Sequence, residues 1–267
     1  MRSNAAISPS RRANRAPKGP RSRAALLSLL LLAGGAAPAP EDDGAHYRRC
    51  LDEARSVPDK ALAEADDWRR ADGGFPAAHC AAVALFGLKR YAEAAQRFED
   101  LAGAMMQRRP DLRAGALEEA GQAWLLAGKP AAARAAFDAA LRFTPRDAEL
   151  YIDRARADGA ADAFRDAVDD LDAALAIDPG RADALVYRAS AYRELGRLDR
   201  ARADVGRALE LVPDHVEGHL ERGNIRRLDG DIAGARADWE EVERLAPDTP
   251  AAKAAADNLA RLAAAAK

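Results

Sequence analysis

The sequence has 267 residues, enough for one or two ordinary domains or for one elongated array of repeats. Helix-favouring residues dominate and aromatic residues make up only 5% of the chain. Residues 1–40 hold seven of the 41 Lys and Arg residues and none of the 43 acidic residues, so the chain after them has a formal charge of −9. Such a chain repels phosphate backbones and anionic lipids, and we expect no nucleic-acid partner.

Residues 1–39 have the order of a secretory signal peptide. Basic residues extend to Arg23, an apolar run follows from Ala24 to Ala33, and small residues follow the run. The run is too short to cross a bilayer comfortably. We therefore predict that the leader is removed and that the chain is exported to the periplasm or secreted, with no stable membrane span. An amphipathic or disordered basic tail is the alternative.

Two cysteines, Cys50 and Cys80, follow the leader. In an oxidising compartment an even number of cysteines favours a disulfide. A buried free cysteine is also a common core residue, so both interpretations stay open at this point.

A period of 34 residues organises the middle of the chain. Small residues recur at this step in two series, Gly121, Ala155, Ala189 and Gly223, and Ala133, Ala167, Ala201 and Ala235. Prolines recur at the same step at positions 145, 179, 213 and 247. The series define four units, which span residues 114–147, 148–181, 182–215 and 216–249.

Each recurrent residue has a mechanical role in a pair of helices. Small side chains allow the two helices of a unit to approach closely, and the proline ends the second helix because its ring cannot continue the hydrogen-bond ladder. Gly128, Gly196 and Gly230 mark the turn inside three units, and Asp162 replaces the glycine in the fourth. The pattern predicts four antiparallel helix pairs.

These residues, and stretches such as YRASAYRELGRLDRARADVGRALELVPD, resemble the tetratricopeptide-repeat family over residues 114–249. The resemblance implies an all-α fold, a right-handed superhelical solenoid of antiparallel helix pairs, in an exported protein of bacterial type. An unrelated helical repeat is the alternative.

The two ends of the chain depart from the regular pattern. Residues 41–113 are expected to form divergent units of the same kind, with one unit beginning near Phe75 and with Pro110 ending its second helix. After the last unit, Pro250 begins a helix in which Leu259 and Leu262 share one face. We expect residues 250–267 to cover the apolar face of the last unit, as repeat arrays require.

The sequence offers little material for catalysis. Few hydroxyl or thiol side chains follow the leader, and no glycine-rich phosphate loop is present, so we predict no catalytic residue, no enzyme activity and no cofactor. His215 and His219 lie four residues apart, a spacing that can place two metal ligands on one helical face. Because no cysteine or second pair supports a site there, we also predict no metal.

A series of charged residues recurs at the same period. Arg154, Arg188 and Arg222 occupy the seventh position of their units, which faces inward, and Asp170, Asp204 and Asp238 recur at the same step. A buried arginine needs a carboxylate partner, since an unpaired buried charge is costly. We predict a structural ladder of Arg–Asp pairs; a charged patch that binds a ligand is the alternative.

The family resemblance also implies where a partner would bind. First helices of such units line a concave groove, and the positions carried over to this chain are Glu118, Gln122, Ile152, Arg156, Val186, Ser190, Arg193, Leu220, Asn224 and Arg227. The Lys and Asn residues with which some relatives hold a terminal carboxylate are missing, which argues against recognition of that kind. The expected function is a non-enzymatic scaffold or adaptor that binds protein or peptide segments; a self-associating structural subunit is the alternative.

Overall fold

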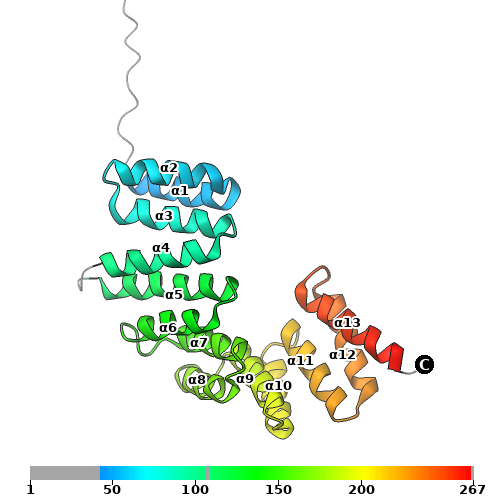
Figure 1. The fold of residues 1–267 in the computed structure, drawn as a ribbon. Coiled ribbons are helices and arrows are strands. Elements are labelled where there is room, and N and C mark those ends of the chain that lie inside the picture. The colour runs from blue at the N-terminus through cyan, green and yellow to red at the C-terminus, as the bar shows by residue number, and fades with distance from the viewer. Residues whose placement is uncertain (1–42, 106–108, 266–267) are drawn as a thin grey trace, which may run out of the picture. The chain divides into compact units, whose positions relative to one another are not determined.

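The computed structural model describes residues 43–105 and 109–265, and the predicted leader lies outside this part of the chain. The described residues form thirteen helices and no strands, which confirms the all-α class (Figure 1). In chain order the helices are α1 (Asp43–Ser56), α2 (Pro58–Arg70), α3 (Gly74–Gly87), α4 (Tyr91–Ala104), α5 (Pro110–Leu126), α6 (Pro130–Leu141), α7 (Ala148–Ala160), α8 (Phe164–Ile177), α9 (Ala182–Glu194), α10 (Leu198–Leu211), α11 (Val216–Leu228), α12 (Ile232–Leu245) and α13 (Pro250–Ala265).

Two of the small residues predicted to bring paired helices together each leave room for an aromatic ring of the partner helix. A Cβ atom at Gly121 of α5 would clash with the ring of Phe137 on α6, and one at Gly223 of α11 would lie 2.5 Å from Trp239 on α12. The rings are fully buried. Larger residues at these two glycines would therefore separate the helices of each pair.

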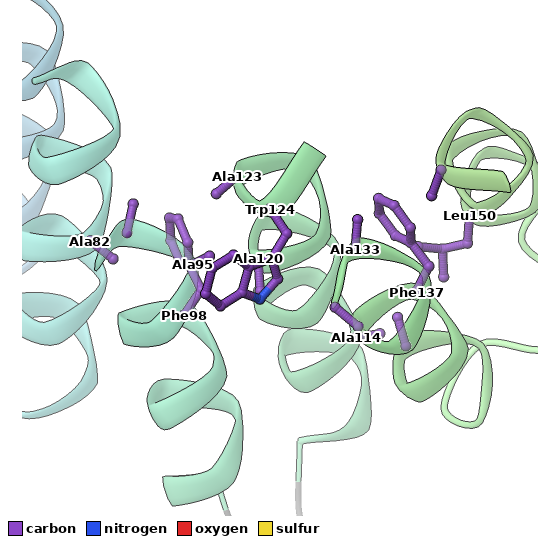
Figure 2. Close-up of a cluster of buried hydrophobic side chains, with 14 of the residues drawn as sticks. Ala82, Ala95, Phe98, Ala114, Ala120, Ala123, Trp124, Ala133, Phe137 and Leu150 are labelled. Atoms are coloured by element: carbon purple, nitrogen blue, oxygen red, sulfur yellow. The ribbon is translucent and has the colours of Figure 1, made fainter. Parts of the chain in front are cut away.

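The core is continuous from one helix pair to the next. Figure 2 shows Phe98, Trp124, Phe137 and Leu150, from α4 to α7, in one cluster with alanines between them. Apolar burial of this kind, repeated along the chain, is what stabilises an array in which each unit contacts only its neighbours.

The turn inside each regular unit needs a residue in the left-handed conformation. Gly128, Gly196 and Gly230 have φ angles of 69°, 70° and 84°, and Asp162 occupies the same place with a φ of 58°. Aspartate tolerates this conformation better than most residues do. The substitution at residue 162 therefore preserves the turn.

One sequence prediction about the helix ends was wrong. Pro110 does not end α4, which stops at Ala104, but is the first residue of α5. Proline is well suited to the first turn of a helix, where its missing N–H would have no partner, and the acidic Asp111 that follows favours the same end. As a result, α5 begins four residues before the first regular unit.

The last helix covers the end of the array. Leu259 and Leu262 of α13 pack against a buried cluster that contains Ala235, Trp239 and Val242 of α12. No helix in the described ranges is both long enough and apolar enough to cross a membrane.

Candidate binding surface on the first helices

The first helices of the pairs lie next to one another along the array. Contacts join α1 with α3, α5 with α7, α7 with α9, α9 with α11 and α11 with α13, whereas contacts of that extent are not found between consecutive second helices of the described chain. The first helices therefore form the inner surface. The first helices α3 and α5 do not pack together as closely as the other neighbouring first helices do, and a cavity lies between them.

We call this cavity the N-terminal cavity; its volume is about 580 Å³. Its wall comes from three first helices and the end of α4: Tyr47 of α1, Phe75, Pro76 and His79 of α3, Met105, and Asp111, Leu112, Gly115, Ala116, Glu118, Glu119 and Gln122 of α5. Asp111 and Leu112 belong to the extra first turn of α5. The sequence prediction missed this part of the site because it treated the residues around Pro110 as a helix end.

Large apolar side chains in the N-terminal cavity remain in contact with solvent. Phe75 is 47% exposed and Leu112 is 44% exposed, while Met105 and Ala116 are buried. A partner side chain that covered Phe75 and Leu112 would remove apolar area from water, which is favourable by about 25 cal/mol per Å².

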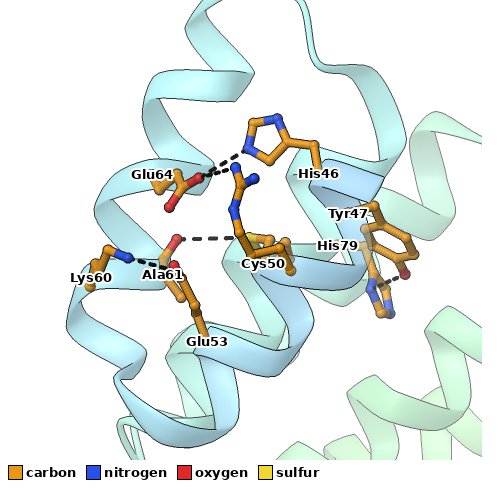
Figure 3. Close-up of a disulfide and its surroundings, with 10 residues drawn as sticks. His46, Tyr47, Cys50, Glu53, Lys60, Ala61, Glu64 and His79 are labelled. Carbon is orange, nitrogen blue, oxygen red and sulfur yellow. Dashed lines mark hydrogen bonds and ion pairs between the residues drawn. A yellow bond between two sulfur atoms is a disulfide. The ribbon is translucent and has the colours of Figure 1, made fainter. Parts of the chain in front are cut away.

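A chain of hydrogen bonds crosses one side of the cavity. Tyr47 Oη lies 2.8 Å from His79 Nδ1, and His79 Nε2 lies 2.8 Å from Glu119 Oε2. Both ring nitrogens of His79 thus have a hydrogen-bond partner, the Tyr47 hydroxyl on one side and the Glu119 carboxylate on the other. Figure 3 shows Tyr47 and His79 facing each other. Burial and then the charge of Glu119 raise the pKa of Tyr47, which keeps the phenol protonated.

Glu118 is the least compensated acid of the cavity. Burial, and then the charges of Asp153, Asp147, Glu149 and Glu119, raise the pKa of Glu118 to about 7. Its hydrogen-bond partner is the Gln122 amide, which donates at 3.4 Å, and no Lys or Arg of the described chain pairs with it.

A polar network connects the N-terminal cavity with a second one. Gln122 Nε2 also donates to Asp153 Oδ2 at 3.0 Å, and Asp153, which is buried on α7, accepts from Arg156 at 2.7 Å. Arg156 and Ser190 line the second cavity, whose volume is about 450 Å³. Four of the residues expected to face a partner therefore line cavities: Glu118, Gln122, Arg156 and Ser190.

The charged series forms ion pairs between the two helices of a unit. Arg188 Nε and Nη2 on α9 each donate at 2.7 Å to the carboxylate of Asp204 on α10, which makes a bidentate ion pair. Arg154 binds Asp170 in the same bidentate geometry. Arg222 donates to Asp238 at 2.6 Å.

The same arginines also reach the preceding unit. Arg154 bonds to Asp138 of α6, and Arg188 Nη1 lies 2.5 Å from Asp172 of α8. The third arginine, Arg222, has Gly206 at the corresponding position one period later, so it lacks this second carboxylate. We call the set the Arg–Asp ladder; its first two rungs join neighbouring units, and its third rung does not.

Comparison with known proteins agrees with this architecture. The family model of the tetratricopeptide repeat matches residues 81–148, 152–215 and 188–250. The chain belongs to the tetratricopeptide-repeat (TPR) family. No match was found among curated protein sequences.

Solved TPR structures share the fold at low sequence identity. TTC0263, a thermophilic TPR protein of Thermus thermophilus, is 23% identical with a TM-score of 0.57, covering 70% of this chain and 99% of its own. MamA from Desulfovibrio magneticus RS-1 is 19% identical with a TM-score of 0.56, covering 66% of this chain and 99% of its own. YrrB, a TPR protein with an unusual peptide-binding site, is 19% identical with a TM-score of 0.53, covering 67% of this chain and 97% of its own.

Two residues expected in the TPR groove do not face solvent. Ile152 and Val186 are buried, and Ile152 belongs to a core cluster that includes Ala184 and Ala189 of the next first helix, α9. Both residues are the fifth of their units. Because consecutive first helices pack together, this position lies at the junction between them and not on an open surface. Glu118 occupies the same position in its unit but is only half-buried, because it also lines the N-terminal cavity.

The remaining expected groove residues lie near the C-terminal end. Arg193 Nε donates to the buried Glu221 at 2.7 Å, Asn224 contacts the same carboxylate at 3.4 Å, and Asn224 Oδ1 accepts from Asn258 of α13 at 3.1 Å. Burial raises the pKa of Glu221. Leu220 packs against the cluster under α13, and Arg227 is exposed. Most of these expected groove residues thus already contact other residues of the TPR array.

The structure places the two cysteines and the two histidines as follows. Cys50 of α1 and Cys80 of α3 are joined by a disulfide and are fully buried. His215 Nδ1 accepts from the backbone N–H of Gly218, and His219 Nε2 lies 2.8 Å from the carbonyl oxygen of Pro213. The two imidazoles therefore form hydrogen bonds around the N-terminus of α11.

Proposed function

We propose that this TPR protein is a non-enzymatic scaffold or adaptor that binds segments of partner proteins along its first helices. The observation that carries the proposal is the N-terminal cavity, where Phe75 and Leu112 stay exposed beside Glu118, a carboxylate with no cationic partner in the described ranges. An exposed apolar patch with a polar rim is typical of a binding surface. YrrB, which shares the fold, has a peptide-binding site, and this supports a peptide-binding role for the present chain.

The chemistry of the cavity supports binding better than catalysis. The hydrogen-bonded chain through His79 ends at the Tyr47 hydroxyl, whose pKa is raised, so this hydroxyl is a poor nucleophile at neutral pH. The histidine in this chain is held from both sides by Tyr47 and Glu119.

The site of action that we propose is the periplasm or the exterior of the cell. The order of basic, apolar and small residues in positions 1–39 supports export, and a disulfide between Cys50 and Cys80 fits an oxidising compartment. N-terminal sequencing of the protein from its native host tests this step. We expect cleavage near Ala36 to Ala39 and hence a new N-terminus near Ala37 to Pro40, and recovery of the protein with Met1 from the cytoplasm would contradict export.

Self-association is the second candidate, and it has less support. An end-to-end assembly needs an exposed apolar terminal face, but Leu259 and Leu262 of α13 pack against the Trp239 cluster at the C-terminal end. Sedimentation of the purified protein separates the candidates: a scaffold sediments as a monomer, whereas a structural subunit forms larger species at low concentration.

Photo-cross-linking tests the scaffold function itself. A photoreactive phenylalanine analogue is placed at Phe75 or Leu112 in the cavity, and at Arg236 or Glu240 on the exposed side of α12 as matched controls. We expect defined peptides of partner proteins to be attached at the two cavity positions only. Equal labelling at all four positions would argue against a binding role for the first helices.

A further inference from the structure

The charges of the N-terminal cavity indicate what kind of segment it accepts. Among the described residues, the carboxylates of Asp111, Glu118 and Glu119 line the cavity, and no described lining residue is a Lys or Arg. Two of the carboxylates have a partner: Glu119 is bound to His79, and Asp111 has Arg109 at 3.8 Å. Glu118 is therefore the carboxylate with capacity for an external cation.

Apolar surface lies in the same cavity. Phe75 on α3 and Leu112 on α5 contribute exposed side chains to its wall, and Met105 and Ala116 contribute buried ones. A segment that used both features would insert an apolar side chain between α3 and α5 and place a positive charge near Glu118. A negatively charged segment would instead approach three carboxylates, with Asp153, Asp147 and Glu149 acting on Glu118 from the side of α7.

We propose that the N-terminal cavity binds an exposed segment of a partner protein in which a large apolar side chain is adjacent to an arginine or lysine, with the cation paired to Glu118. This inference rests on the proposed scaffold function and specifies the partner. Glu118 is half-buried, where a charge-assisted hydrogen bond is stronger than on an open surface. The apolar contact contributes most of the affinity, and the ion pair makes the cavity specific for segments that carry a positive charge.

The raised pKa of Glu118 gives the pairing a pH dependence. Near pH 6 most of this carboxyl is protonated, and near pH 8 most of it is ionised and can pair with the cation. The other charged or titratable groups around it are Glu119 on α5, the acids of α7, and Asp111, His79 and Tyr47 across the cavity. A variant without the Glu118 charge separates the effect of Glu118 on the pH dependence of binding from the effects of these other groups.

Synthetic peptides measured against the full chain test the proposal. The probes are labelled Gly/Ser peptides with a central Leu-Arg, Leu-citrulline, Leu-Glu or Ala-Arg pair, and the readout is the Kd from fluorescence anisotropy. Citrulline has the shape of arginine without its charge. We expect the Leu-Arg peptide to bind about tenfold more tightly than the Leu-citrulline peptide at pH 8, with a smaller ratio at pH 6.

Variants assign the effect to the cavity. Glu118→Gln is expected to bring the ratio below about twofold without weakening the Leu-citrulline peptide, and Phe75→Ala to weaken both peptides. Glu240→Gln, an exposed change on α12, is the matched control and should change neither. Circular dichroism confirms that each variant is folded.

Each outcome decides between the two proposals. Binding of all leucine peptides with equal affinity, or preference for Leu-Glu, would overturn the inference and leave the scaffold function standing. If folded protein binds none of the peptides and photo-cross-linking at Phe75 also fails, both proposals are wrong. A dimer that Phe75→Ala dissociates would show that a second copy of the chain occupies the cavity, which also overturns the inference.

Discussion

Arg188 offers a direct test of the Arg–Asp ladder, because it binds one well-buried and one exposed carboxylate. The side chain of Asp204 is 12% exposed and that of Asp172 is 53% exposed, while Arg188 itself is 20% exposed. Arg188→Ala would leave Asp204 without compensation in the interior. Breaking a fully buried pair costs about 3–5 kcal/mol, and the residual exposure of this pair lowers the expected cost to about 2–3 kcal/mol.

Two double-mutant cycles measure the rungs separately. Arg188→Ala is combined with Asp204→Ala in one cycle and with Asp172→Ala in the other, and free energies of unfolding are obtained from urea denaturation at constant m value. We expect a coupling of about 2 kcal/mol for Asp204 and below about 1 kcal/mol for Asp172. The Asp172 cycle serves as the internal control, since it uses the same arginine.

The reverse result would refute the structural interpretation. A coupling near zero between Arg188 and Asp204, together with lost partner binding in a folded Arg188→Ala protein, would assign these arginines to ligand recognition. A larger coupling for Asp172 than for Asp204 would contradict the argument from burial.

Two further predictions concern links between helices. Because a Cβ at Gly206 meets no neighbouring atom, Gly206→Asp should supply the carboxylate that Arg222 lacks and stabilise the protein more than Gly206→Asn does, by up to about 1 kcal/mol in urea denaturation. A difference that persists in the Arg222→Ala background would exclude the ion pair as its cause. The Cys50–Cys80 bridge spans 30 residues, so its reduction should destabilise the first helices by about 3–4 kcal/mol, seen as faster amide exchange in α1–α3 with α9–α12 unchanged. Equal exchange with and without reductant would contradict a structural role for the bridge.

The period of 34 residues predicted the helix pairs because the recurring small residues are needed for close packing of the two helices within each unit. Gly121 meets Phe137 and Gly223 meets Trp239 of the paired helix, so the spacing of small residues reflects close packing within a unit. The Arg–Asp series likewise predicted contacts such as Arg188 with Asp204 from the need to compensate an inward charge. These features depend only on residues within one unit.

The binding surface was harder to predict because it depends on contacts between units. Ile152 and Val186 were expected on an open groove, but the junction of adjacent first helices buries them. The N-terminal cavity depends on the longer α5, whose start the sequence signalled with Pro110 and Asp111. Proline followed by an acid is a pattern for a helix beginning, which could have revealed the extra turn and with it Leu112.

The hydrogen bond between Asn224 and Asn258 bears on how the array of repeats can lengthen. The two residues are 34 apart, and Pro250 begins α13 one period after Val216 begins α11. The α13 helix therefore stands in the register of the first helix of a unit. Duplication of residues 216–249 in the gene would insert a whole unit while presenting α13 with the same neighbouring side chains as before. An array with this register can lengthen by tandem duplication while α13 keeps its contacts.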